Sequence, residues 1–124
     1  MTAVVLIGCA PYEGSYAPGC VAYVGDKIDL NDGRFVWEKF SDQVFVNDDG
    51  EVVNQFPGYP MTGTYRIDGK SIHMESDAGA PVQSMYLHQR DKRHYLLTAE
   101  QSAELEKSGN YAECALILGV NSAN

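Results

Sequence analysis

Met-Thr-Gly-Thr-Tyr-Arg-Ile-Asp-Gly-Lys-Ser-Ile-His-Met-Glu, residues 61–75, is the stretch in which hydrophobic pattern, turn chemistry and strand register agree. Asp68-Gly69 predicts a tight type I′ turn, and the flanking residues alternate between apolar and polar as in a β-hairpin. A two-residue turn there places Tyr65 opposite Ile72, and by the same register Gly63 lies opposite Met74. These four residues share an apolar face. The polar face carries Thr64, Arg66, Ser71 and His73.

Such a hairpin needs a core to cover its apolar face, and the bulk composition supplies one. The chain has 124 residues, of which 44% are hydrophobic and 21% charged, so it predicts a single globular domain. The formal net charge is −8 and only nine residues are Lys or Arg, which argues against nucleic acid and anionic lipid surfaces as partners. The one basic cluster, residues 90–94, is interrupted by Asp91 and predicts a solvated hairpin tip.

The first nine residues allow two interpretations. Leu6-Ile7-Gly8-Cys9 resembles the lipobox of bacterial lipoproteins, in which the cysteine becomes lipidated, although the apolar stretch is short and lacks a basic start. Alternatively, residues 4–7 form a first β-strand and Cys9 is an ordinary small residue. We favour the lipobox slightly, because residues 10–15 have the composition of a tether. The predicted division is a tether or signal remnant over residues 1–13 and a single β-barrel domain over residues 14–124.

Three cysteines leave one without a partner in any disulfide scheme. If Cys9 is lipidated, Cys20 and Cys114 can pair and close a loop of 114 − 20 = 94 residues, worth roughly 4–5 kcal/mol on the chain-entropy model. The competing pair, Cys9 with Cys20, leaves Cys114 as a buried thiol. Spacing does not decide between them. Because no Cys-x-x-Cys or Cys-x-x-His spacing occurs, the cysteines do not predict a metal site.

A second hairpin is predicted around Asp32-Gly33, between residues 26–31 and 34–40. Its two-residue turn gives a register in which four large apolar side chains share one face, and Trp37 is by default a core residue. The four are Ile28, Leu30, Phe35 and Trp37.

A third strand pair, residues 43–47 with 51–56, surrounds Asp48-Asp49-Gly50. A two-residue turn would put two acids opposite each other, so a three-residue loop with a left-handed Gly50 is expected, with Val46 opposite Val52. A calcium loop is excluded because Phe45 occupies the first ligand position.

The last third of the chain predicts a fourth hairpin, residues 82–89 with 94–98, in which either Leu96 or Leu97 faces inward. A helix over residues 99–108 follows, since Thr98 and Gln101 form a capping-box sequence and Gly109 can end the helix. It should cap one end of the sheet. The apolar run of residues 114–120 predicts a strand buried on both sides or one that closes a barrel.

No pattern of catalytic chemistry is present. The sequence contains no nucleophile elbow, no zinc-protease helix and no phosphate-binding glycine loop, so we expect no enzyme and no cofactor. His73 is assigned to the outer face of its hairpin. His88 and His94 flank one hairpin tip and could approach each other, but without a third ligand they do not predict a metal centre.

Three segments together resemble small bacterial lipocalin-like envelope lipoproteins. They are residues 28–35 (Ile-Asp-Leu-Asn-Asp-Gly-Arg-Phe), residues 62–72 (Thr-Gly-Thr-Tyr-Arg-Ile-Asp-Gly-Lys-Ser-Ile) and residues 94–97 (His-Tyr-Leu-Leu). The resemblance covers roughly residues 14–98. The chain is also similar in part to the N-terminal domain of the outer-membrane lipoprotein of copper resistance and envelope stress. This similarity rests on Gly14, residues 18–20 and the turn at residues 30–35. That family has a Cys-x-x-Cys pair where this chain has Cys20 alone, so its metal and redox role is not implied.

The resemblance and the hairpins imply an all-β fold, a small antiparallel meander β-barrel of about 8–10 strands with one short helix. The first functional hypothesis is a non-enzymatic, lipid-anchored periplasmic or outer-membrane protein that binds a small apolar ligand or another envelope component. A cavity above about 300 Å³ at Trp37, Tyr65 and Met74 would favour the ligand. The alternative is a protein inhibitor of a cell-wall hydrolase, acting through residues 56–60 and 76–81. The candidate barrel lining comprises Ile28, Leu30, Phe35, Trp37, Tyr65, Ile72 and Met74.

Overall fold

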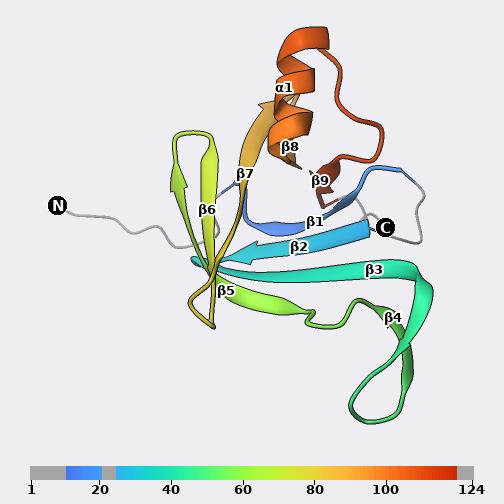
Figure 1. Ribbon diagram of the computed structural model, residues 1–124. Helices are drawn as coiled ribbons and strands as arrows, with labels where there is room; N and C mark the ends of the chain where they lie inside the picture. The colour runs from blue at the N-terminus through green and yellow to red at the C-terminus, as the bar shows by residue number, and fades with distance from the viewer. Residues whose placement is uncertain (1–10, 21–24, 120–124) are drawn as a thin grey trace, which may run out of the picture.

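The computed structural model describes residues 11–20 and 25–119. Its elements in chain order are β1 (Gly14–Pro18), β2 (Gly25–Asn31), β3 (Arg34–Val46), β4 (Val52–Gln55), β5 (Met61–Asp68), β6 (Ser71–Ser76), β7 (Pro81–Arg90), β8 (Arg93–Leu97), α1 (Ala99–Ser108) and β9 (Leu116–Leu118). All strand pairs are antiparallel, and eight strands form a closed barrel in which neighbours in sequence are neighbours in space. β4 is outside this ring (Figure 1). The predicted meander barrel with one short helix is therefore confirmed.

The barrel closes between the two ends of the domain. β9 pairs with β8 on one side and with β1 on the other, so the apolar run near the C-terminus supplies the closing strand, as predicted. Cys20 and Cys114 form a disulfide with their Cα atoms 4.9 Å apart, and the nearby Gly19 N–H donates to the Ala115 carbonyl at 2.9 Å. The Cys20–Cys114 pairing is thus confirmed. Cys9 lies outside the described residues, as does the proposed strand at residues 4–7.

The β2–β3 hairpin has the predicted register. Asp32 and Gly33 both have positive φ, 56° and 80°, as a two-residue type I′ turn requires. Leu30 lies opposite Phe35 and Ile28 opposite Trp37.

The β5–β6 hairpin has a different turn from the predicted one. Gly69 and Lys70 form the turn, and Asp68 is the last residue of β5, paired with Ser71. Gly69 alone supplies the positive φ (66°), which suits the first position of a two-residue turn. The longer ladder places Ile67 opposite Ile72, an apolar pair, whereas a turn at Asp68-Gly69 would place Ile67 opposite Lys70. The register has shifted by two residues, so the predicted faces are retained.

Both leucines of β8 are buried, on opposite faces of the strand. The turn before them is Asp91-Lys92, with φ values of 54° and 71°. Leu96 lies opposite Leu87 and faces the barrel interior, whereas Leu97 packs outside the barrel with Leu105 of α1. The prediction that one of them faces inward is met by Leu96.

Helix α1 begins and ends as the sequence predicts. The Thr98 hydroxyl accepts from the Gln101 N–H, and the Gln101 side chain accepts from the Thr98 N–H, both at 3.1 Å. Gly109 (φ 79°) ends the helix. Leu105 is its one buried residue, and the helix packs over β7 and β8 (Figure 1). No helix in the described residues is long and apolar enough to cross a membrane.

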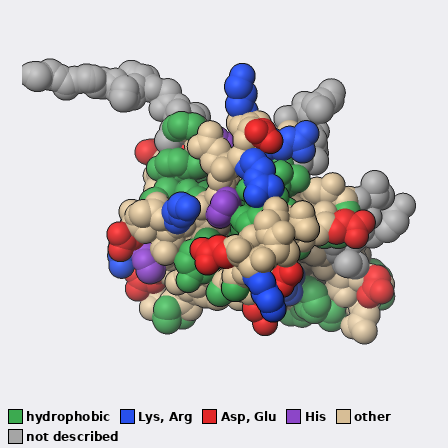
Figure 2. Space-filling model, turned by 90° about the horizontal axis from the view of Figure 1, so that it is seen from above, with side chains coloured by type: hydrophobic (Ala, Val, Ile, Leu, Met, Phe, Trp, Pro, Cys, Tyr) green, Lys and Arg blue, Asp and Glu red, His purple; other side chains and the backbone are tan. Residues whose placement is uncertain are grey.

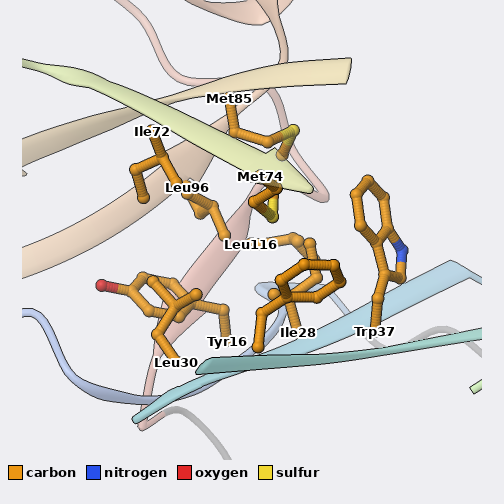
Figure 3. Packing of buried hydrophobic residues seen from close by; sticks show 10 residues of the cluster. Tyr16, Ile28, Leu30, Trp37, Ile72, Met74, Met85, Leu96 and Leu116 are labelled. Atoms are coloured by element: carbon orange, nitrogen blue, oxygen red, sulfur yellow. The ribbon is translucent and has the colours of Figure 1, made fainter. Parts of the chain in front are cut away.

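The barrel interior is filled by side chains from almost every strand. Figure 3 shows this cluster, in which the aromatic and aliphatic residues contact one another across the barrel. Its members are Tyr16, Ile28, Leu30, Phe35, Trp37, Ile72, Met74, Met85, Leu96 and Leu116.

A two-stranded ribbon projects from the barrel. The second half of β3 and the whole of β4 leave the barrel wall together after an irregularity between Phe40 and Phe45 (Figure 1). We call residues 42–56 the arm. The predicted three-residue loop is confirmed, with Val46 opposite Val52 and Gly50 at φ 82°.

Candidate functional site

A cleft of about 480 Å³ opens at the end of the barrel from which the arm projects. Five segments meet there: the start of β2, the middle of β3, the residues before β5, the β6–β7 turn and the end of β8. Its apolar wall comprises Trp37, Tyr59, Met61, Pro81 and Val82. Its polar groups come from Asp26, Lys39, Ser76, Gln83 and Thr98. A concave site with an apolar wall and a few polar groups is the usual form of a small-ligand site.

Trp37 joins the barrel core to this cleft. The side chain is only 5% exposed and belongs to the core cluster, yet its Nε1 has no hydrogen-bond partner. In Figure 3 the indole nitrogen is on the side of the ring that faces away from the cluster. A buried N–H without a partner costs roughly 1–3 kcal/mol.

An ion pair stands beside Trp37. Lys39 Nζ lies 3.3 Å from Asp26 Oδ1, because Asp26 and Lys39 are opposite each other in the β2–β3 register. The same ammonium lies 5.8 Å from the centre of the Phe56 ring. A second hollow of about 370 Å³ shares Asp26, Lys39 and Thr98 with the cleft and extends toward Leu116. The ion pair therefore stands between two adjoining hollows.

The predicted lining residues fall into two groups. Most of them are buried within the packed core, as is most of the Trp37 side chain. The buried ones are Ile28, Leu30, Phe35, Ile72 and Met74. Of the seven, only Trp37 lines the cleft. Tyr65 and Met74 instead border a separate hollow of about 270 Å³ that also includes His73 on the outer face.

Residues 12–16 close the opposite end of the barrel. The Tyr65 hydroxyl donates to Glu13 Oε2 at 3.4 Å, and the Asp32 N–H donates to the same oxygen at 2.8 Å. Burial, with a smaller contribution from Glu13, raises the pKa of Tyr65 to about 12. The buried Tyr16 hydroxyl donates to the Tyr12 carbonyl at 2.6 Å, and burial raises its pKa as well. These phenols stay neutral near pH 7 and serve to close the barrel end.

Sequence reasoning missed most of the cleft residues. The register of the Asp32-Gly33 turn does pair Asp26 with Lys39, so this ion pair could have been found. Tyr59 belongs to residues 56–60, which the sequence analysis named only as a loop of the inhibitor hypothesis. Val82 and Thr98 carry no such signal, because only closure of the barrel brings them to Trp37.

The two histidines at the β7–β8 tip, which could have approached each other, point to opposite faces of the sheet. His88 lies opposite Tyr95 and His94 opposite Gln89, so adjacent ladder positions direct them to opposite faces. His88 Nδ1 is 3.1 Å from the Tyr111 hydroxyl; burial, with smaller contributions from Lys70 and Arg90, lowers the pKa of His88. Within residues 11–20 and 25–119, no three His, Cys, Asp or Glu side chains are grouped to hold a metal ion.

The cleft thus combines a shaped apolar wall, a buried unpaired donor and a partly exposed ion pair. Such an arrangement can bind a molecule that has an apolar body and a hydrogen-bond acceptor. No protein-family model, curated protein or solved structure matches this chain.

Proposed function

We propose that this protein is a non-enzymatic binding protein of the bacterial cell envelope that holds a small amphipathic ligand in the cleft beside Trp37. The observation that carries the proposal is the buried, unpaired Nε1 of Trp37, a donor on a side chain that lines a cleft of about 480 Å³. Solvent-excluded donors without a partner are rare in folded proteins, and a binding site is one reason to retain one.

The cleft defines the chemistry of the ligand. Its volume falls within the roughly 300–1,000 Å³ typical of small-molecule sites. Tyr59, Met61 and Val82 offer an apolar surface to a hydrocarbon chain or ring. An acceptor oxygen, carbonyl or carboxylate, would accept from the Trp37 N–H, and Lys39 would attract a negative charge, an attraction reduced by its ion-pair partner Asp26 in the same cleft.

The envelope location is supported by the disulfide. Cys20 and Cys114 join the first and last strands of the barrel, and such structural disulfides persist in oxidising compartments such as the bacterial periplasm. That residues 6–9 act as a lipobox and that Cys9 carries a lipid anchor remain predictions from the sequence. Membership of the lipocalin-like envelope lipoproteins is likewise a prediction, based on resemblance alone.

Binding can be tested with decanoate as the probe, and with decanol as its uncharged counterpart. Trp37 is the only tryptophan of the chain, so its fluorescence reports directly on the cleft. We expect decanoate to change the Trp37 emission and to bind in calorimetry more tightly than decanol. Trp37→Phe keeps an aromatic ring but removes the N–H donor, and it should weaken decanoate binding about 5- to 30-fold, equivalent to about 1–2 kcal/mol.

The matched control is Tyr65→Phe, which removes a polar hydrogen from an aromatic side chain that does not line this cleft. It should leave decanoate affinity unchanged. Failure of both probes to bind, or equal affinity in the wild type and Trp37→Phe, would contradict the proposal.

A second candidate, the inhibitor of a cell-wall hydrolase, is favoured by the surface around the cleft. Tyr59 and Pro81, from the two loops predicted to act, lie on the same rim, and the net charge of −8 suits a basic enzyme. Inhibition of lysozyme in a cell-wall lysis assay at micromolar protein would support this candidate. Unchanged lysis at that concentration would exclude lysozyme as the target.

A further inference from the structure

The tip of the β7–β8 hairpin carries two arginines that face each other across the strands. Arg90 ends β7, Arg93 begins β8, and the two are directly opposite in the ladder. Like charges in this position destabilise a sheet. Neither arginine takes part in the ion pairs found among residues 11–20 and 25–119. The tip therefore holds two neighbouring cations that repel each other and that no carboxylate of the described chain pairs with.

Two stacked tyrosines lie beside this arginine pair. Tyr95 is two residues from Arg93 and so shares its face of the strand, and its ring stacks on Tyr111 with the ring centres 3.7 Å apart. The Arg90 guanidinium lies over the Tyr111 ring, 4.7 Å from its centre, and donates one N–H to the Gly109 carbonyl at 3.2 Å. Neither contact neutralises the charge. Arg90 is thus held in place and keeps further N–H donors for a ligand.

The arginines and the tyrosines line one hollow of about 470 Å³ on the outside of the barrel. It lies where the end of β7 comes beside α1 (Figure 1). Figure 2 looks down on this side of the molecule, and Lys and Arg side chains gather over the middle of the view. The hollow shares no lining residue with the cleft beside Trp37. Its chemistry, two guanidiniums beside aromatic rings, suits an anion rather than an apolar chain.

We propose that the hollow at the β7–β8 tip binds the phosphate group of a small molecule, with Arg90 and Arg93 as its ligands. A guanidinium fork can donate two parallel N–H bonds to phosphate oxygens. A phosphate carries a charge of about −1.5 to −2 at pH 7, enough to compensate both arginines and to remove their mutual repulsion. This site is independent of the function proposed for the cleft.

The surrounding charges limit what can bind. Asp91 also lines the hollow, so its carboxylate opposes an anion there. The net charge of −8 repels polyanions, which need an extended basic surface, but residues 90–93 hold three of the nine Lys and Arg residues. A single phosphate group meets this local excess of positive charge. The site therefore fits a small phosphorylated molecule or free phosphate, and not a nucleic acid.

Binding can be followed by amide chemical shifts of the full chain in NMR, with phenyl phosphate, inorganic phosphate and phenol as the probes. At pH 7.5 and concentrations up to about 10 mM, both phosphates should shift the amides of residues 90–95, and phenol should not. Tighter binding of phenyl phosphate would assign the site to a phosphorylated organic molecule, and equal binding would assign it to free phosphate. The affinity should fall as salt rises, because the guanidiniums are exposed.

Two variants change the charge of the hollow in opposite directions. Arg93→Gln should weaken phosphate binding about 5-fold or more, and its guanidinium has no hydrogen bond or ion pair in the described chain whose loss would disturb the fold. Asp91→Asn should strengthen binding about 2- to 3-fold, and asparagine tolerates the positive φ of this turn position (54°). The control is Arg66→Gln, which removes an exposed arginine of β5 that does not line the hollow. It should leave the affinity unchanged.

Trp37 separates this site from the cleft, because it lines the cleft and not the hollow. Its emission should stay constant while phosphate shifts the amides of the tip. A change in Trp37 emission without shifts at residues 90–95 would place the phosphate beside Lys39 and overturn the proposal. Absence of shifts with either phosphate, or equal weakening by Arg93→Gln and Arg66→Gln, would also overturn it. Failure of decanoate to bind the cleft would leave these results unaffected.

Discussion

Arg34 and Asp77 form a bidentate ion pair that joins β3 to the turn between β6 and β7. The two N–O distances are 2.9 and 2.8 Å, and the Thr62 hydroxyl donates to the same carboxylate at 2.6 Å. These hydrogen bonds, the guanidinium's first, lower the pKa of Asp77 to about 2 from 3.8. Both side chains are 51% exposed, so the pair lies on the barrel surface where solvent screens it.

The Asp77 carboxylate should make a pH-dependent contribution to stability. Because its pKa is lower in the folded chain, the contribution is present above about pH 4 and disappears as the pH falls through 2. Asp77→Asn should therefore lower the unfolding midpoint in urea at pH 7 and have little effect at pH 2. Asp48→Asn removes the same charge from the arm tip and serves as the control. A constant difference between Asp77→Asn and wild type across this pH range would contradict the assignment.

Gly63 allows β5 and β6 to approach Phe35 closely. A Cβ atom at this position would lie 2.0 Å from the Glu75 carbonyl oxygen, 2.8 Å from the Ser76 Cα and 2.7 Å from a ring carbon of Phe35. Two of these neighbours are backbone atoms, which cannot rotate away. Gly63→Ala should thus destabilise the protein by about 3 kcal/mol, the upper part of the range for overpacked sites.

Denaturant unfolding of Gly63→Ala against Thr64→Ala tests this. Thr64 is the exposed next residue of β5, and its truncation should cost less than about 0.5 kcal/mol. Equal losses for the two variants would show that the space around Gly63 is not limiting.

Local signals predicted the elements whose geometry is set locally. Asp32-Gly33 fixed its hairpin because both residues adopt the positive φ of a type I′ turn. Asp68-Gly69 has the same sequence but a different turn, because pairing Ile67 with Ile72 adds an apolar contact that turn statistics do not include. Tertiary packing decides between two turns that differ little in local energy.

β1 and the cleft depend on contacts distant in sequence. Residues 14–18, Gly-Ser-Tyr-Ala-Pro, have weak strand propensity, yet Tyr16 is fully buried because β2 and β9 enclose it. The cleft likewise brings Asp26 of β2 and Thr98, which follows β8, to one site, although β1 and β9 lie between these two strands in the sheet. Single-sequence patterns carry the period and the turns of a meander, but not the distances across its interior.

The capping box of α1 should account for a defined part of the stability. Thr98 and Gln101 satisfy each other's backbone N–H groups at the start of the helix. Thr98→Ala removes the hydroxyl acceptor and should cost about 1 kcal/mol. Thermal unfolding followed by circular dichroism measures this cost, and Thr98→Ser, which retains the hydroxyl, should restore most of it. A loss that Thr98→Ser does not reduce would mean that the methyl group of Thr98, rather than the cap, stabilises this junction.

The Cys20–Cys114 disulfide should provide the largest single contribution, because the loop that it closes contains most of the barrel. The separation of 94 residues corresponds to roughly 4–5 kcal/mol of chain entropy removed from the unfolded state. The Cys20→Ser/Cys114→Ser variant should lose about 3–5 kcal/mol of unfolding free energy, and reduced wild type should behave similarly.

The loss should act mainly through the unfolded state, because the backbone bond from Gly19 to Ala115 and the β1–β9 ladder remain in the double variant. Hydrogen exchange can separate the two states. Amides of β1 and β9 should then lose protection by the same free energy as amides of β5 and β6, since the whole barrel opens together. Selective loss at β1 and β9 would show instead that the disulfide stabilises a local junction of the folded barrel.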